Sequence, residues 1–236
     1  MRKKIRIVTW NCAMALRRKF REVASLDADL LVLQECSRAD VEGLKSVGLE
    51  LACWIGDHAH KGLALAARSK FQVTAKPICG IQWAIQGITG RGSKLGIVAI
   101  WACAPEREER YIRQVHKLLD LGILQKLPPT ALVVGDFNSN TIWDGKHRER
   151  SHSRAVEKFA LAGYRSAYHD LYDEPQGQES IATFFLHRHP RKPYHIDYAF
   201  LSPQLRQDLR KIEIGRPEVW LRTSDHMPFS IEIDRR

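Results

Sequence analysis

The sequence has few of the features that mark zinc modules, disulfide-rich proteins or membrane proteins. Its five cysteines are odd in number and include no Cys-x-x-Cys pair. Neither a zinc module nor a disulfide framework is therefore expected, and a reducing compartment is favoured. No apolar run approaches the roughly 20 residues needed to cross a bilayer, and the N-terminal MRKKIRIVTWN has no apolar segment long enough for a signal peptide. These absences predict a cytoplasmic protein without membrane insertion.

Low-complexity segments and Ser/Gly-rich linkers that would divide the chain are also absent. Of the 236 residues, 44% are hydrophobic and 27% are charged, which is ordinary for a globular protein and argues against disorder. A chain of this length can bury a sizeable core. We therefore expect residues 1–236 to form a single domain, and we expect the protein to be a monomer.

Negative charge is under-represented. The chain has 37 basic and 27 acidic residues, which gives a formal net charge of +10. Such an excess favours a polyanionic partner, with nucleic acid first and an acidic membrane surface second. The alternative is a soluble protein whose basic character has no functional meaning.

Apolar patterning predicts a mixture of strands and helices. The continuous apolar runs 30–33 and 131–134 are typical of strands covered on both faces. The clearest helix is expected over 106–119, where apolar residues form one stripe and opposite charges are paired four residues apart. Ser37 is expected to cap a second helix over 37–47.

Further elements are expected along the rest of the chain. They are helices at 17–25 and before Gly163, and strands at 5–10, 51–56, 62–67, 71–76, 95–104, 182–185, 195–202, 212–215, 219–222 and 227–233. Strands dominate this order and helices are interspersed among them. Two packed sheets flanked by helices fit the pattern best.

Polar residues interrupt the strand-like segments in five places, most of which contain a carboxylate. They are Asn11, Gln34–Glu35, Asp136 with Asn138, Asp197, and Ser224–Asp225–His226. Most have an ordinary explanation, because Asn11 and Asp136 suit turns and Glu35 suits the start of a helix. Asp197 is different, because apolar and aromatic residues flank it and a buried carboxylate is costly unless it is paired. A histidine would be its natural partner.

Taken together, these residues suit the hydrolysis of a phosphate ester. The carboxylate oxygens of Glu35 and Asp225, with no thiolate pair, suit Mg²⁺ or Mn²⁺ and not a structural zinc ion. Such an ion would neutralise phosphoryl charge and stabilise the departing oxygen. His226 has the intrinsic pKa of a base for the attacking water, and Asp197 could fix its tautomer.

Five short segments resemble the motifs of a known family, the endonuclease/exonuclease/phosphatase superfamily of metal-dependent phosphodiesterases, whose members are DNase I-like or exonuclease III-like. The segments are TWN at 9–11, LQE at 33–35, GDFN at 135–138, HIDYAF at 195–200 and SDHMP at 224–228. They follow the family's order and extend over nearly the whole chain. The resemblance implies a four-layered α/β sandwich with two central mixed β-sheets flanked by helices, and a single catalytic domain over residues 1–236.

The resemblance also implies roles for the polar residues around one metal ion. By this analogy, Glu35 is the principal metal ligand and Asn11 supports the metal and the phosphate. Asp225 would be a second carboxylate on the metal side. Asp136 would position or activate the attacking water, and Asn138 would hold the phosphate oxygens. His226 would pair with Asp197, acting either as the base or as an imidazole that stabilises the phosphate.

The sequence departs from the family pattern at two positions. Many members have a tyrosine or histidine that touches the scissile phosphate where this chain has Trp101. Tryptophan donates one hydrogen bond and cannot act as an acid, so the source of the leaving-group proton is open. Nucleases that cut abasic DNA often have an aspartate where this chain has Ala13, which makes an abasic-site repair role less favoured.

Two basic clusters flank the motifs. One covers 146–154 and includes Arg148, and the other covers 187–192 and includes Arg191. Both are expected to contact phosphates, and the alternative is a pair of solvated loops. Tyr194, beside the second cluster, is expected to stack on a base or sugar unless it belongs to the core.

The leading functional hypothesis is a Mg²⁺- or Mn²⁺-dependent nuclease that acts on DNA, or on RNA. The alternative is a phosphodiesterase or phosphatase that acts on a small-molecule or lipid headgroup phosphate. The absence of a hydrophobic, membrane-seeking hairpin in the sequence argues against a lipid substrate. A third hypothesis, a non-catalytic nucleic-acid-binding protein with this fold, is disfavoured because all the inferred catalytic side chains are present.

Overall fold

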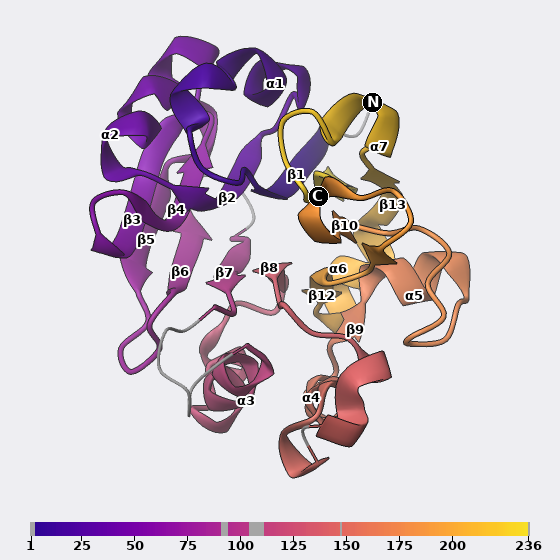
Figure 1. Cartoon of the computed structure of the whole chain (residues 1–236). Helices are drawn as coiled ribbons and strands as arrows, with labels where there is room; N and C mark the ends of the chain where they lie inside the picture. Colours follow the sequence, from indigo (N-terminus) through magenta and orange to yellow (C-terminus); the bar gives the residue numbers. More distant parts are fainter. Residues whose placement is uncertain (1–2, 91–93, 104–110, 147, 236) are drawn as a thin grey trace.

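Two β-sheets lie face to face in this protein, and helices cover their outer faces. The computed structural model describes residues 3–90, 94–103, 111–146 and 148–235 (Figure 1). The resulting order of layers is helices, sheet, sheet and helices, and both sheets have six strands. The four-layered α/β sandwich expected from the sequence is confirmed.

The first sheet contains both ends of the described chain. Its strands are β1 (Lys3–Asn11), β2 (Leu30–Cys36), β3 (Glu50–His58), β4 (Lys61–Ala67), β13 (Leu209–Ile214) and β14 (Phe229–Arg235). Their order is β13-β14-β1-β2-β4-β3. β1 and β2 are parallel, and the other neighbouring pairs are antiparallel.

The second sheet repeats this arrangement around a second parallel pair. Its strands are β5 (Val73–Pro77), β6 (Ala84–Thr89), β7 (Gly96–Trp101), β8 (Ala131–Asp136), β9 (Arg165–Ser166) and β12 (Asp197–Leu201). Their order is β5-β6-β7-β8-β12-β9, in which only β7 and β8 are parallel among the described strands. A separate two-stranded ribbon consists of β10 (Phe184–Phe185) and β11 (Pro193–Tyr194).

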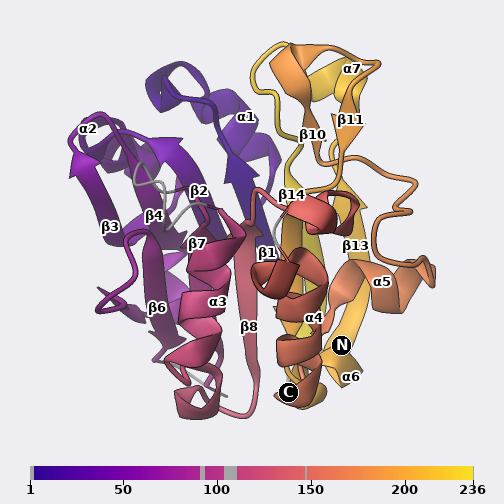
Figure 2. The same ribbon diagram turned by 60° about the horizontal axis from the view of Figure 1, so that its bottom comes forward.

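Helices cover the outer face of each sheet. α1 (Phe20–Ser25) and α2 (Arg38–Val41) pack on the first sheet. The second sheet is covered by α3 (Ile112–Asp120) and α4 (His152–Leu161), which lie in front of its strands in Figure 2. The other helices are α5 (Ala167–Tyr172), α6 (Pro203–Asp208) and α7 (Pro217–Trp220), with 3-10 turns at Leu16–Arg18, Glu42–Val47, Ser69–Phe71, Leu124–Lys126, Thr141–Lys146, Arg148–Arg150 and Leu186–Arg188. None of the helices in the described ranges has the length and apolar character needed to cross a membrane.

Three apolar layers hold the sandwich together. The layer between the sheets includes Leu65 of the first sheet and Leu132 of the second. The outer layers include Leu33 beneath α1 and α2, and Val115 of α3 above β7 and β8. Burial of each such aliphatic side chain stabilises the fold by roughly 1.5–3 kcal/mol. Because β2 and β8 are buried on both faces, their segments 30–33 and 131–134 are continuously apolar, as expected.

Most of the local predictions are confirmed, and a few are wrong or incomplete. The Ser37 cap is confirmed, because the backbone N–H of Asp40 donates to its hydroxyl at 3.0 Å. The helix expected over 106–119 is present from Ile112, and residues 104–110 lie outside the described ranges. The strand expected at 219–222 is wrong, because Pro217, whose fixed φ suits the first turn of a helix, opens α7 there.

Candidate active site

The carboxyl ends of the two parallel strand pairs meet at one place. Asn11, the last residue of β1, donates from Nδ2 to Glu35 Oε1 of β2 at 3.3 Å and to Asp136 Oδ2 of β8 at 3.1 Å. Asp136 is paired in the second sheet with Trp101 on one side and with Asp197 on the other. The fold therefore brings polar residues from both sheets to a single edge.

Glu35 lies in a β-bulge of β2. Its φ is 58°, and the pairing of β2 with β4 shifts register between Gln34 and Cys36. A left-handed backbone is uncommon for a residue with a side chain and costs on the order of 1 kcal/mol or more, so it is often found at functional sites. The Glu35 side chain is 23% exposed, and Lys61 Nζ lies 3.3 Å from its Oε1. Glu35 is therefore an accessible carboxylate that already faces a cation.

Asp136, in contrast, is fully buried. Asn138 donates to it from the backbone N at 2.8 Å and from Nδ2 at 2.9 Å, in addition to the Asn11 contact. The preceding Gly135 is required by packing, because a Cβ there would lie 1.9 Å from the carbonyl oxygen of Ile100 on β7. Burial raises the pKa of Asp136 to about 7, although neighbouring donors oppose this shift.

His226 and Asp197 form the buried pair that the sequence suggested. His226 Nδ1 lies 3.0 Å from Asp197 Oδ2. Thr183 Oγ1 accepts hydrogen bonds from the backbone N of Ile196 and of Asp197, both at 3.0 Å, and so fixes the start of β12. The ring of Phe184 lies 4.6 Å from the imidazole. The other Asp197 oxygen, Oδ1, has no hydrogen-bond partner among the described residues.

His226 lies between two carboxylates. Its Nε2 is 3.9 Å from Asp136 Oδ2, on the side opposite Asp197. Burial alone lowers the pKa of His226, but the negative charges of Asp197 and Asp136 outweigh it and raise the pKa to about 9. One ligand atom from each of the three side chains lies within 4.8 Å of the others. This arrangement favours an imidazolium at neutral pH.

The loop that carries His226 is fixed to β1. Ser224 Oγ donates to the Asn11 carbonyl at 2.7 Å, and Trp10 Nε1 donates to the His226 carbonyl at 3.1 Å. Asp225 is half-buried on this loop and is not one of the three clustered ligands. Its charge acts on Lys19, whose pKa is lowered mainly by burial, an effect that Asp225 opposes. The metal-ligand role predicted for Asp225 stays a prediction.

The four residues predicted to bind substrate lie in different surroundings. Trp101 is 1% exposed and stacks on Trp83 with ring centroids 4.5 Å apart. Tyr194 is half-buried, and Arg191 is exposed. The side chain of Arg148 lies outside the described part of the chain. The substrate contacts predicted for these residues stay predictions.

Sequence reasoning does not assign roles to several residues that build the site. Lys61 has no motif around it, and the sequence pattern places Thr183 only in a strand. Asn140 has a usable signal, because it lies two residues after Asn138 in GDFNSN. Its Nδ2 contacts Glu179 Oε2 at 3.1 Å and the His195 carbonyl at 3.0 Å, which ties the loop after β8 to neighbouring segments.

The donor set fits a hard divalent cation. Glu35 and Asp136 present carboxylate oxygens around one Asn11 nitrogen, and a cationic group, the Lys61 ammonium, already lies on Glu35. Asp197 adds an unpaired buried oxygen. Oxygen donors without a thiolate suit Mg²⁺ or Mn²⁺. Asn11 Oδ1 accepts from the backbone N of Ala13 at 3.1 Å, so its amide would have to turn to become a ligand.

Solved structures with the same fold include a 3′ phosphatase and two AP endonucleases. The chain superposes on a variant of the 3′ phosphatase NExo from Neisseria bound to a product DNA hairpin, with 19% identity, a TM-score of 0.73, and coverage of 98% of this chain and 99% of that one. It also superposes on an AP endonuclease from Archaeoglobus fulgidus, with 17% identity, a TM-score of 0.74, and coverage of 98% and 99%. The AP endonuclease LMAP from Leishmania major is 15% identical and superposes with a TM-score of 0.72, covering 99% of this chain and 89% of that one. At these identities the likeness establishes the fold.

Sequence comparison establishes the family. Among curated proteins, no sequence matches this chain significantly. The model of the Endonuclease/Exonuclease/phosphatase family matches residues 8–226. This range includes Asn11, Glu35, Asp136, Asp197 and His226, which the fold brings to one sheet edge. The chain therefore belongs to the endonuclease/exonuclease/phosphatase family of phosphoesterases.

Proposed function

We propose that this protein is a divalent-metal-dependent nuclease that hydrolyses phosphodiester bonds in DNA by attack of water, with residues 1–236 as a single catalytic domain. The observation that carries the proposal is the buried Asp136–His226–Asp197 cluster next to the accessible carboxylate of Glu35. A desolvated acid–imidazole pair beside a cation ligand suits hydrolysis of a phosphate ester.

The geometry supports a division of roles among these residues. A bound Mg²⁺ or Mn²⁺ would supply charge neutralisation for the phosphate and the leaving oxygen, and Glu35 with Asn11 and Asp225 would hold it. Asp136, held rigidly by Asn138 and Asn11, would orient the attacking water and take its proton. His226, flanked by two carboxylates, suits an imidazolium that donates to a phosphate oxygen.

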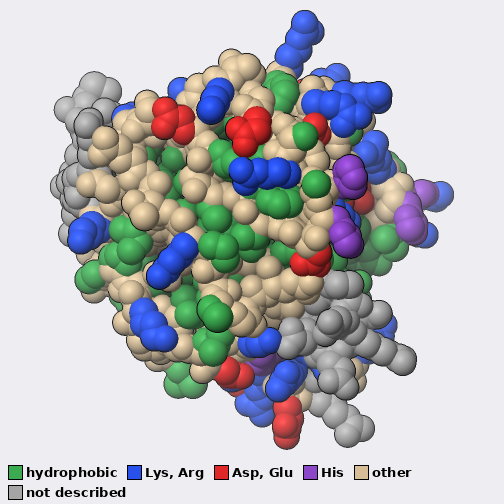
Figure 3. Space-filling model, turned by 90° about the vertical axis from the view of Figure 1, so that its left-hand side faces the viewer, with side chains coloured by type: hydrophobic (Ala, Val, Ile, Leu, Met, Phe, Trp, Pro, Cys, Tyr) green, Lys and Arg blue, Asp and Glu red, His purple; other side chains and the backbone are tan. Residues whose placement is uncertain are grey.

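Charge and aromatic surface favour nucleic acid as the substrate. The net charge of +10 suits a polyanion, and the face in Figure 3 carries Lys and Arg side chains spread among hydrophobic and acidic ones. Three half-buried rings, of Phe184, Tyr194 and Trp143, form a run that begins at His226, with centroid distances of 4.6, 6.3 and 5.3 Å. Such rings can stack on bases or sugars. The 3′ phosphatase with the same fold, whose structure contains a product DNA hairpin, favours DNA over RNA.

Nearby cations would complete this surface. Arg191 is exposed beside Tyr194, and we expect Arg191 and Arg148 to contact phosphates. Trp101, in contrast, would contribute as packing beneath the site, because it is 1% exposed. We further propose that the protein acts as a cytoplasmic monomer.

A substrate panel tests the proposal. Supercoiled DNA, abasic duplex, single strands, RNA and phospholipid would each be incubated with Mg²⁺, Mn²⁺ or EDTA. We expect metal-dependent hydrolysis of DNA that EDTA abolishes and that His226→Ala lowers by about 10³-fold or more. His58→Ala, which removes an exposed imidazole, is the matched control and should retain full activity.

Other results of the panel would overturn the proposal. Faster turnover of phospholipid than of every polynucleotide would favour the lipid or small-molecule phosphodiesterase. Metal binding without turnover of any substrate would indicate a non-catalytic binding protein. Cleavage of DNA by His226→Ala at the wild-type rate would show that the proposed site does not catalyse the reaction.

A further inference from the structure

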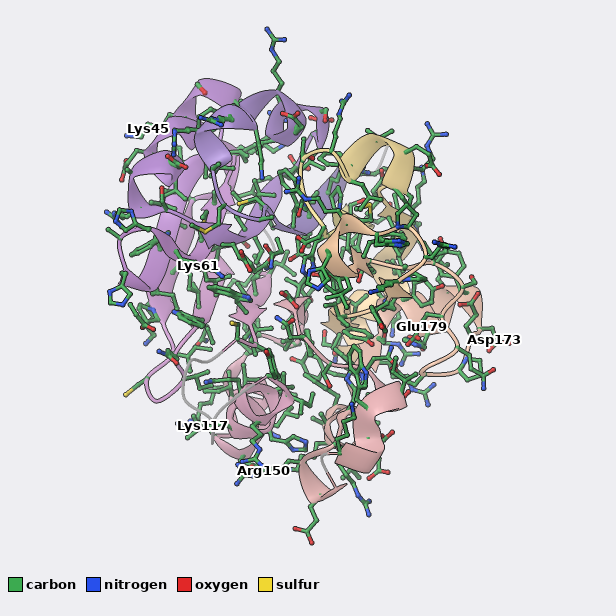
Figure 4. All side chains as sticks on the ribbon, viewed as in Figure 1. Lys45, Lys61, Lys117, Arg150, Asp173 and Glu179 are labelled. Carbon is green, nitrogen blue, oxygen red and sulfur yellow. The ribbon has the colours of Figure 1, made fainter. Side chains whose placement is uncertain are left out.

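Lys61 faces the candidate active site from outside the family motifs. It is the first residue of β4, next to the bulge that turns Glu35 outward. Its Nζ lies 3.3 Å from Glu35 Oε1 and 5.0 Å from the centroid of the Trp101 ring. Figure 4 labels Lys61 on the half of the molecule opposite Glu179. Its side chain remains 44% exposed, so its ammonium can exchange partners.

The buried Trp101 at the end of β7 presents no polar group to a phosphate at this position. This residue is paired with Asp136 across the second sheet, where a polar side chain could have contacted a phosphate held near Asp136. Its indole is instead buried and stacked on Trp83 at 4.5 Å, and Nε1 has no partner within the described residues. The group that lies over this ring is the Lys61 ammonium.

Lys61 contacts one acid of the site directly and lies near the other, because Glu35 and Asp136 share the Asn11 nitrogen. The charges of Lys61, Glu35 and Asp136 all act on the pKa of the half-buried Cys103 thiol. Burial raises the pKa of Cys103 to about 11, Lys61 opposes this shift, and Asp136 and Glu35 add to it. The three groups lie close together, because Glu35 Oε1 and Asp136 Oδ2 lie 3.3 and 3.1 Å from Asn11 Nδ2, and Lys61 Nζ lies 3.3 Å from that Glu35 oxygen. A phosphate bound between Glu35 and Asp136 would lie within reach of Lys61.

We propose that Lys61 is a further catalytic residue, one that rests on Glu35 in the metal-free protein and contacts a non-bridging phosphate oxygen once a divalent cation occupies Glu35. This inference depends on the proposed function. Lysine suits the exchange, because its ammonium is a compact charge with three donors on a flexible stem. The buried Trp101 ring provides a fixed surface beneath the ammonium. The ion pair is partly exposed, so breaking it costs little.

Two measurements test the inference, one of metal binding and one of turnover. Mn²⁺ binding to the metal-free protein is measured by calorimetry, and turnover is measured on bis(4-nitrophenyl) phosphate, which does not depend on the identity of the natural substrate. Lys61→Met keeps the stem and removes the charge. It should bind Mn²⁺ about three- to tenfold more tightly, because no cation competes for Glu35, while kcat/KM falls about 10- to 100-fold.

Matched variants separate this role from a structural one. Lys61→Arg should retain most of the turnover, and Lys61→Gln is the second neutral variant if Lys61→Met does not fold. Lys45→Met removes the same charge from an exposed position in the Glu42–Val47 turn (Figure 4) and should change neither quantity. Tighter metal binding together with slower turnover is a pattern that misfolding does not produce.

The outcomes distinguish the inference from the proposed function. If the wild-type protein and Glu35→Gln both fail to bind Mn²⁺, both the proposed function and this inference are overturned. If the wild-type protein binds Mn²⁺ and Glu35→Gln does not, the proposed metal site stands. Unchanged Mn²⁺ affinity or unchanged turnover in both Lys61→Met and Lys61→Gln would then overturn the role of Lys61 alone.

Discussion

The two sheets of this protein end their central parallel strands in the same way but in different environments. β2 ends near Glu35 and β8 ends at Asp136, and both acids contact the same Asn11 nitrogen. Glu35 lies in a bulge, is 23% exposed and faces Lys61. Asp136 is fully buried in a regular strand and faces His226.

The difference indicates how one topology can supply two chemical roles. A bulge moves a carboxylate toward solvent, where it can exchange a lysine for a metal ion. A regular buried strand withholds water from its carboxylate, and the resulting rise in pKa makes it a better proton acceptor. The first sheet is thus suited to holding a cation, and the second to proton transfer.

The largest expected effect comes from removing the charge of the buried acid. Asp136→Asn should lower kcat for DNA hydrolysis about 10³- to 10⁴-fold, because the amide that replaces the carboxylate cannot take the proton of water. Steady-state kinetics over a range of Mn²⁺ concentrations would measure this. Extra metal should not restore the rate, whereas recovery at high Mn²⁺ would mean that Asp136 is mainly a metal ligand. The exposed Asp57→Asn is the control.

The close approach of β7 to β8 provides a second test, on stability. Gly135→Ala should lower the free energy of unfolding by about 4 kcal/mol, because the new Cβ would lie 1.9 Å from the Ile100 carbonyl oxygen. Gln34→Ala, at the corresponding position before Glu35, removes one hydrogen bond of 2.9 Å to Thr9 Oγ1 and should cost about 1 kcal/mol. Urea unfolding would measure both, and equal costs would contradict the difference between the sheets.

A third, smaller effect is expected at the exposed acid. Glu35→Gln should lower kcat/KM about 10²-fold and weaken Mn²⁺ binding, because a neutral amide is a poorer ligand for a hard cation. Unlike Asp136→Asn, this variant should regain much of its activity as Mn²⁺ is raised. Calorimetry and kinetics on the same preparation would check both points, and a loss that no metal concentration restores would assign Glu35 to the chemical step.

The smallest effect concerns Glu179, which accepts a hydrogen bond from Asn140 in the loop after β8, and it is measured as stability in acid. Burial alone raises the pKa of Glu179, but hydrogen bonds from His169, Gly177 N and Asn140 lower it to about 2. A depressed pKa stabilises the folded state above the unfolded value of about 4.5, and this contribution is lost as the pH falls toward 2. Thermal melts of Glu179→Gln should show a stability loss of about 2 kcal/mol at pH 7 that shrinks below pH 4. A pH-independent loss would exclude this role.

Much of the architecture could be predicted from the sequence. Continuous apolar runs marked β2 and β8, and polar residues at strand ends marked Asn11, Glu35 and Asp136. The pairing of Asp197 with a histidine followed from the cost of burying a lone carboxylate. These inferences depend on local composition, which a sequence displays directly.

The remaining features depend on side-chain direction, which the sequence does not display. The bulge at Glu35 and the burial of Trp101 both arise from packing between strands far apart in the chain. The position of Lys61 over that ring follows from the pairing of β4 with β2. α7 replaced an expected strand because a proline opens it. Each of these features requires knowledge of neighbours that no local pattern contains.

The antiparallel pairing of β1 with β14 has a consequence for folding during translation. β1 is synthesised before its partner over Phe229–Arg235, which follows more than two hundred residues later. His226 lies just before β14 in the sequence and is synthesised with it. The proposed active site would therefore stay incomplete until the segment with His226 is synthesised and β14 docks against β1.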